Sequence, residues 1–293
     1  MLFDKIGYPT LNSYVEDFFN KLLVTNKTFE YFVDWDKVAN KVANYATELA
    51  ILNSLVRIKD REKHLFFLLK QYPKVVKVIP LLIAERAKNG IIDIFDPSLE
   101  EFVTFEFDEK KISPNDIEKI TFFCKETGIL DLFDKIKDLH DYLLGVEVGI
   151  DTNTRKSRSG NIFEEMCLNK LSKMVGSKLR IVKHDPQFSL YPIIGKGRGK
   201  VHDIVIYFKD YPRFVIECNF YNVTGSKPIS IAESYLEMDR VAKQHGIVFV
   251  WVTDGPAWKK MKDPLLRSMY EMDWVFNYKL LNLFPRVLNY YGL

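Results

Sequence analysis

The order of apolar and polar residues predicts different structures for the two halves of the chain. In the first half, apolar residues recur at steps of three and four, which is typical of one face of a helix. The clearest such stripe is formed by Val42, Tyr45, Leu49, Leu52 and Val56. Another helix is predicted to start at Ser113, where a Ser cap precedes a Pro in the first turn and an acid three residues on. This helix is interrupted near Gly128 and resumes toward Leu143, whereas residues 100–107 alternate like a short strand.

After about residue 145 the pattern changes to short apolar runs that alternate with amphipathic stretches. We predict strands at 203–208, 213–220 and 246–252, and helices at 160–175, 229–244 and 262–272. This order of elements predicts a mixed sheet flanked by helices. The predicted fold is therefore α/β over residues 146–293, preceded by a mostly helical region over residues 1–145.

The composition is that of a globular protein, with 47% hydrophobic and 28% charged residues. No apolar stretch is long enough to cross a membrane, and no signal peptide is evident at the N-terminus. The three cysteines are scattered without paired spacing, which favours a reducing compartment and argues against a zinc site. We therefore expect a cytoplasmic protein without a membrane partner.

The positive charge is concentrated in one part of the chain. Residues 151–200 contain eleven Lys or Arg and four Asp or Glu, so this block carries +7 while the rest of the chain carries −4. Such a block indicates a polyanionic partner, although a solvated surface is the simpler alternative. Its last part, "GKGRGK" at 195–200, is predicted to be a loop in which Lys196, Arg198 and Lys200 contact phosphates.

The candidate chemistry lies in the strand "RFVIECNF", which carries a Glu at its centre. A buried strand normally excludes an ionised carboxylate unless a partner or a metal compensates the charge. Strand alternation places Glu217 and Asn219 on one face, and Asp203 begins the neighbouring strand. Carboxylates so placed suit Mg²⁺, which polarises a phosphodiester and activates water. A third acid is available from the preceding helix, where only one of Glu164 and Glu165 can face the sheet.

This arrangement is that of the PD-(D/E)xK nucleases, with two departures. No Pro precedes Asp203, and Asn219 stands where the pattern has Lys. On spacing alone the signal is weak, since an Asp and a Glu fourteen residues apart occur in many proteins by chance. An Asn cannot act as an acid or base, but its amide can hold a water. Lys227 is a further cation close to these acids in the sequence, and it is predicted either to supply the missing charge or to contact the DNA backbone.

Four longer segments strengthen this interpretation. They are "DTNTRKSRSGNIFEE", "HDIVI…FVIECNFYNVTGSKP", "SYLEMDR" and "FVWVTDGPAW". In this order, from about Gly149 to Tyr278, they resemble the DpnII/MboI family of type II restriction endonucleases. The most specific parts are R-S-G-x-x-x-E and E-x-N-F-Y-N-x-x-G-S-K, and the resemblance covers close to half of the chain. The helical N-terminal half contains no matching motif.

The resemblance implies roles for individual residues. Asp203 and Glu217 match the metal-binding acids, Asn219 matches the position usually held by Lys, and Glu164 matches the acid of the R-S-G segment. These four residues are the predicted catalytic set. Basic and polar residues around them are the predicted DNA contacts: Arg155, Lys156, Arg158, Ser159, Lys196, Arg198, Lys200 and Lys227. The Ser159–Gly160 pair is interpreted as a helix start that either binds a phosphate or is an ordinary cap.

The two nearby histidines receive a plainer interpretation. His184 and His202 show no metal-ligand spacing, and we interpret them as packing or surface residues.

The resemblance further implies a Mg²⁺-dependent homodimer that recognises double-stranded 5′-GATC-3′ and cuts before the G. A cognate adenine methyltransferase would be its genetic partner. One alternative is a structure-specific nuclease, such as a resolvase or repair enzyme. Another is a DNA-binding protein that has lost catalysis because the Lys is absent, although three retained acids argue against this.

Overall fold

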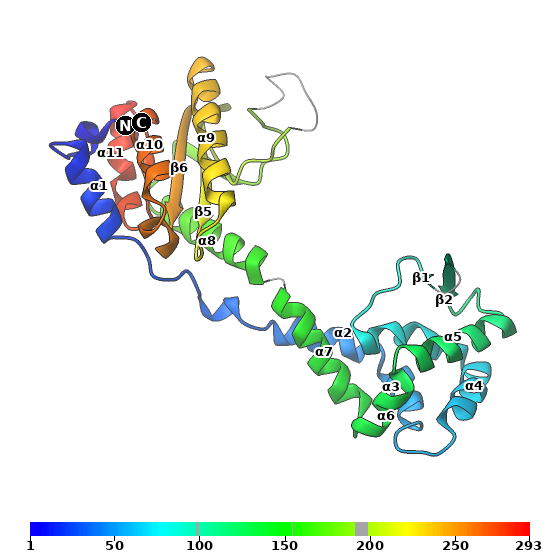
Figure 1. Ribbon diagram of the computed structural model, residues 1–293. Coiled ribbons are helices and arrows are strands. Elements are labelled where there is room, and N and C mark those ends of the chain that lie inside the picture. The colour runs from blue at the N-terminus through cyan, green and yellow to red at the C-terminus, as the bar shows by residue number, and fades with distance from the viewer. Residues whose placement is uncertain (98–99, 154, 191–198) are drawn as a thin grey trace. The chain divides into compact units, whose positions relative to one another are not determined.

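The chain forms two compact units in the computed structural model. The structure describes residues 1–97, 100–153, 155–190 and 199–293. For residues 155–157 it describes the backbone only. One unit combines residues 1–31 with residues 156–293, and the other comprises residues 32–155 (Figure 1). This division differs from the predicted single boundary at 145/146. Helix α7 (Leu139–Asn153) continues through residue 145, where the change of pattern suggested this boundary, and its glycines at 145 and 149 weaken the helix without ending it.

The first unit is built on a five-stranded mixed sheet with the order β3-β4-β5-β6-β7. Its strands are β3 (Leu179–Lys183), β4 (Ile204–Phe208), β5 (Tyr211–Phe220), β6 (Val248–Asp254) and β7 (Val275–Phe276). β3, β4 and β5 are antiparallel neighbours, whereas β5, β6 and β7 run parallel. The central strand β5 therefore joins an antiparallel half to a parallel half.

Helices cover both faces of this sheet (Figure 1). They are α1 (Leu11–Asn20), α8 (Arg155–Ser172), α9 (Ser226–Gln244), α10 (Lys262–Glu271) and α11 (Phe284–Tyr290). On one face, Phe220 of β5 packs against Phe163 of α8 with ring centroids 5.4 Å apart. On the opposite face, Tyr235 of α9 packs against Trp251 of β6 at 5.5 Å. Alternation along β5 thus directs Glu217 and Asn219 toward α9.

The N-terminal residues belong to this unit because they pack into its core. Tyr14 and Phe18 of α1 are fully buried, and the Asn277 side chain donates to the Phe18 carbonyl at 2.8 Å. Asp254, at the end of β6, joins three segments. Its carboxylate accepts hydrogen bonds from the backbone N–H groups of Leu23 and Gly255 at 2.7 Å each, and of Tyr278 at 2.9 Å.

The second unit is mostly helical and contains one hairpin. Its helices are α2 (Trp35–Ala43), α3 (Ala46–Asn53), α4 (Arg61–Gln71), α5 (Pro114–Glu126), α6 (Ile129–Lys135) and α7. Its hairpin pairs β1 (Ile91–Asp96) with β2 (Glu101–Glu106). The predicted cap is confirmed, since Ser113 and Asp116 form a capping box. The predicted interruption is confirmed as well, since Gly128 adopts a φ of 75°.

The predicted fold class is confirmed: a mixed sheet flanked by helices and a mostly helical further region. The three strands predicted for the sheet correspond to β4, β5 and β6, and the predicted short strand at 100–107 corresponds to β2, whereas the edge strands β3 and β7 were not predicted. Within the described residues, none of the helices combines the length and the apolar character that crossing a bilayer requires.

Replacing Asp254 should destabilise the first unit. Asp254→Ala leaves three N–H groups, one buried and two half-buried, without their acceptor, which costs about 3 kcal/mol or more. We expect the melting temperature to fall by about 6 °C or more in thermal unfolding. The control is Glu237→Ala on the exposed side of α9, where loss of the surface ion pair with Arg240 should change stability by less than about 1 kcal/mol. Equal melting temperatures for Asp254→Ala and the parent would contradict this assignment.

Candidate active site

Glu217 is the most buried acid of the candidate site, with 1% of its surface exposed. Three side chains donate to it. His202 Nδ1 lies 2.7 Å from Oε1, while Lys200 Nζ and Tyr235 Oη lie 2.5 and 2.8 Å from Oε2. Burial by itself would raise the pKa of Glu217, but the His202 hydrogen bond and the Lys200 charge hold the pKa below its usual range. Glu217 is therefore an ionised carboxylate in the middle of a sheet.

His202 is oriented by a second contact. The backbone N–H of Leu190 donates to His202 Nε2 at 3.1 Å, so Nδ1 carries the hydrogen that faces Glu217. The ring is fully buried. This histidine was interpreted as a packing or surface residue, and the structure shows that it is also a hydrogen-bond donor to the candidate active site.

Asp203 is the less compensated acid of the pair. Among the described residues, its Oδ2 accepts one hydrogen bond, from the Cys218 backbone N–H at 2.8 Å. Burial, and next the negative charge of Glu217, raise the pKa of Asp203 to about 7. The two acids of the predicted pair thus have pKa values shifted in opposite directions.

Glu164 reaches this site from α8, and His184 reaches it from the segment after β3. One ligand atom from each of Glu164, His184 and Asp203 lies within 4.8 Å of the others. His184 Nε2 lies 2.9 Å from Glu164 Oε2, and the His184 backbone adopts a φ of 48°, a left-handed conformation that is unfavourable for a side-chain-bearing residue. His184 was not among the predicted site residues. As expected, only one of the adjacent acids is turned inward, because the Glu164 side chain is 13% exposed whereas that of Glu165 is 49% exposed and pairs with Lys183 at 2.9 Å.

Asn219 lies one alternation further along β5 than Glu217. Its Oδ1 accepts a hydrogen bond from Trp251 Nε1 at 3.0 Å, which fixes the orientation of its amide group. The acidic and amide groups predicted to form one site are therefore brought together by β5, the start of β4 and α8.

The predicted DNA contacts are distributed less uniformly. Lys200 points into the candidate site, whereas Lys227 is exposed in the first turn of α9. Lys196 and Arg198 lie outside the described residues, and Arg155 and Lys156 are described only as helical backbone. The DNA-contacting roles of these residues remain predictions.

The R-S-G segment is not a helix start, so that interpretation was wrong. α8 begins at Arg155, which places Ser159 and Gly160 in its second turn. Ser159 is buried, and its Oγ donates to Asn26 Oδ1 at 3.1 Å, while Asn26 Nδ2 donates to the Ser159 carbonyl at 2.7 Å. Arg158 donates to the Tyr31 carbonyl at 3.0 Å. This segment therefore holds the N-terminal residues against α8.

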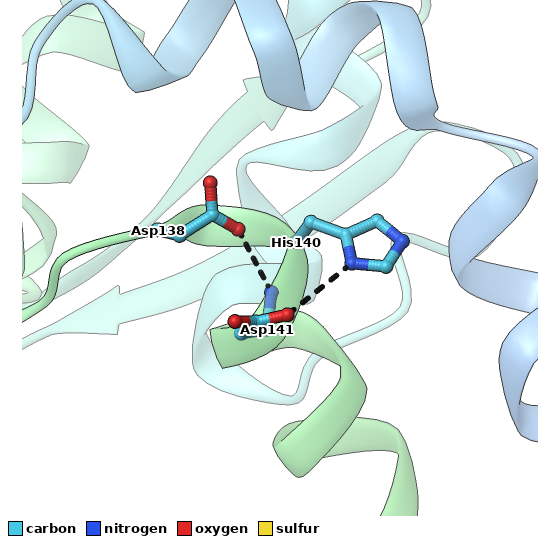
Figure 2. Close-up of side chains that lie close together, drawn as sticks. All are labelled: Asp138, His140 and Asp141. Atoms are coloured by element: carbon cyan, nitrogen blue, oxygen red, sulfur yellow. Dashed lines mark hydrogen bonds and ion pairs between the residues drawn. The ribbon is translucent and has the colours of Figure 1, made fainter.

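A second group of ligand-type side chains lies in the other unit, at the start of α7 (Figure 2). Asp138 Oδ1 accepts from the Asp141 backbone N–H at 3.0 Å, and Oδ2 accepts from Asn53 Nδ2 at 2.6 Å. His140 lies beside Asp141 with Nδ1 3.6 Å from the carboxylate (Figure 2). Asp138 acts as a helix cap here, which accounts for the cluster without a ligand.

Comparison with known proteins finds relatives over most of this chain. The family model for the DpnII restriction endonuclease matches residues 14–284. The type II restriction enzyme MjaIII of Methanocaldococcus jannaschii is 36% identical over 275 residues, covering 89% of this chain and 93% of that protein. DpnII of Streptococcus pneumoniae is 30% identical over 285 residues (89% and 93%), and MboI of Moraxella bovis is 32% identical over 284 residues (95% and 97%). No solved structure gives a significant match.

The fold and the type II restriction enzymes among the relatives identify a site-specific deoxyribonuclease, whose partner is double-stranded DNA. The chain belongs to the DpnII family of restriction endonucleases. Since the match extends from residue 14 to residue 284, the second unit belongs to the family as much as the sheet does. The sequence motifs had indicated the family for the C-terminal half alone.

The pKa of Asp203 should appear in the pH dependence of stability. Folded Asp203 keeps its proton up to pH about 7, whereas the unfolded residue releases it near 3.8, so stability falls as pH rises through this window. Asp203→Asn removes this loss, which is on the order of 2–4 kcal/mol. We expect the variant to lose less thermal stability than the parent between pH 5 and pH 8, with a metal chelator present throughout. Glu165→Gln, at an exposed acid of α8, is the control and should follow the parent; parallel curves for Asp203→Asn and the parent would refute the assignment.

Proposed function

We propose that this chain is a type II restriction endonuclease that binds double-stranded 5′-GATC-3′ and hydrolyses the phosphodiester before the G, using Mg²⁺. The observation that carries the catalytic part is the convergence of Glu164, Asp203 and Glu217 from α8, the start of β4 and β5. The sequence preference rests on the resemblance of the R-S-G and E-x-N segments to the DpnII/MboI family.

The acids are suited to a hard divalent cation. Asp203 and Glu217 would hold Mg²⁺, and the ligand atoms of Glu164 and His184 lie close enough to Asp203 to join them. The fit rests on Asp203 itself, because a buried carboxylate with a raised pKa beside an ionised neighbour gains most from a cation. When bound, the ion would polarise the phosphodiester and lower the pKa of a water.

The residues of the chain would position the reactants around that ion. His202 and Tyr235 fix the Glu217 carboxylate, so its geometry does not depend on the substrate. Asn219, held by Trp251, would orient the attacking water with its amide group. Such positioning lowers the entropic part of the barrier.

The proposed target also implies an assembly. A four-base palindrome has two-fold symmetry, and a homodimer with one active site per strand matches that symmetry. A cognate adenine methyltransferase would protect host DNA, since an N6 methyl group alters the donor that adenine presents in the major groove.

Digestion of plasmid DNA with Mg²⁺ tests the proposed specificity. We expect discrete fragments whose sequenced ends lie at GATC and carry four-nucleotide 5′ overhangs. The same plasmid methylated at the adenine of GATC is the matched control and should remain intact. Cutting restricted to branched DNA would indicate a structure-specific nuclease, and binding without cutting would indicate an inactive DNA-binding protein.

Replacement of the acids tests the catalytic assignment. Asp203→Ala and Glu217→Ala should abolish cleavage, because each removes a metal-binding carboxylate. Asn219→Ala should slow single-turnover cleavage by roughly tenfold to a thousandfold, through lost positioning of the water. Glu165→Ala, adjacent to Glu164 but paired with Lys183, is the control and should cleave like the parent. Near-normal turnover of either acid variant would exclude the proposed site.

A further inference from the structure

The candidate site lacks a lysine at the position where nuclease sites of this type carry one. Asn219 occupies this position on β5, and its carboxamide bears no charge. A phosphodiester gains negative charge as water attacks it, so a cation near the reacting phosphate lowers the barrier. The question is whether another residue of the chain places an ammonium group in the same part of the site.

Lys200 does so from the segment that leads into β4. Its Nζ lies 2.5 Å from Glu217 Oε2 and 4.8 Å from the centre of the Tyr235 ring. The side chain is 33% exposed, compared with 2% for the side chain of Glu217, so its ammonium group lies at the boundary between the buried acid and solvent. A substrate phosphate approaching the acids would meet Lys200 at this boundary.

These contacts distinguish Lys200 from an ordinary phosphate-binding lysine. A lysine that tracks the DNA backbone is a flexible, solvated point charge. Lys200 is instead held by an ionised carboxylate and by an aromatic face, and both interactions keep its ammonium group in a fixed position. Lys227, the other cation considered for this role, is exposed in the first turn of α9.

We propose that Lys200 is the catalytic lysine of this enzyme, supplying from the loop before β4 the ammonium charge that Asn219 cannot supply from β5. This inference rests on the proposed nuclease function and assigns one residue within it. In the reaction, water forms a bond to phosphorus and the P–O3′ bond breaks. The water loses two protons: one is released to solvent, and the leaving 3′ oxygen takes up one proton from solvent in place of the other, so that the protons balance. Lys200 remains protonated throughout and stabilises the charge on the phosphate oxygens.

A different role for Lys200 makes a different prediction. If Lys200 only kept Glu217 ionised for metal binding, then its loss would weaken the affinity for Mg²⁺, and a high Mg²⁺ concentration would restore the rate. If Lys200 acts on the phosphate, then the rate stays low at saturating Mg²⁺. The two roles are therefore separated by the Mg²⁺ dependence of single-turnover cleavage.

The decisive variants remove, keep or relocate the positive charge of Lys200. Lys200→Gln keeps a hydrogen-bond donor for Glu217 but removes the charge, and Lys200→Arg keeps the charge. Asn219→Lys combined with Lys200→Gln returns an ammonium group to β5, on the face that Glu217 occupies. The matched control is Lys173→Gln, at an exposed lysine just beyond the end of α8. Melting temperatures and DNA binding without Mg²⁺ check that each variant is folded and binds.

We expect Lys200→Gln to slow single-turnover cleavage at saturating Mg²⁺ by about a hundredfold or more, with DNA binding changed by less than about threefold. Either Lys200→Arg or the double variant should recover at least about tenfold of that loss. Lys173→Gln should cleave like the parent.

Three results would overturn the proposal: a parent-like rate for Lys200→Gln, recovery of its rate by added Mg²⁺, or no recovery in either charge-restoring variant. Failure of the proposed function looks different, because the parent itself would then cleave no DNA. If the parent cleaves at another sequence, the same variants test Lys200 on that sequence.

Discussion

The hydrogen bonds around Glu217 are the interaction on which the candidate active site depends. An ionised carboxylate in the middle of a sheet is costly unless donors replace its lost water. Here the donors are Lys200, His202 and Tyr235, which come from the segment before β4 and from α9. The charge of Glu217 therefore draws two further segments onto β5, and the same contacts that stabilise the acid also set the geometry of the site.

Asp203 is also a largely buried acid, but few donors compensate its charge. It has one backbone donor and a charged acid as its neighbour, and its pKa is raised to about 7. Two acids with pKa values pushed apart are typical of a site in which they have different tasks. Asp203 costs stability at neutral pH, and a bound cation would offset that cost. The site thus retains the carboxylate of Asp203, which is unfavourable for stability, where the proposed reaction needs a negative charge.

The unit that carries this site is assembled from both ends of the chain. Asp254 binds the backbone of Leu23 and Tyr278 as well as its own turn, and α1 contributes Tyr14 and Phe18 to the core. Ser159 and Asn26 add a second junction between the N-terminal residues and α8. The helical unit of residues 32–155 is inserted between these segments, which explains why one family match extends from residue 14 to residue 284.

The sequence by itself determined the elements and faces that depend on neighbouring residues. Alternation along β5 predicted that Glu217 and Asn219 share a face, the apolar runs predicted β4 and β6, and the resemblance to the DpnII/MboI segments indicated Glu164 and Asp203. Only the tertiary structure decided which distant groups meet these residues. Lys200 and His202 bind Glu217, His184 lies beside Glu164, and α1 packs with the sheet. No pattern of neighbouring residues predicts these contacts, because each joins separate segments of the chain. The short edge strands β3 and β7 escaped prediction for the same reason: pairing with β4 and β6 defines them more than their own few residues do.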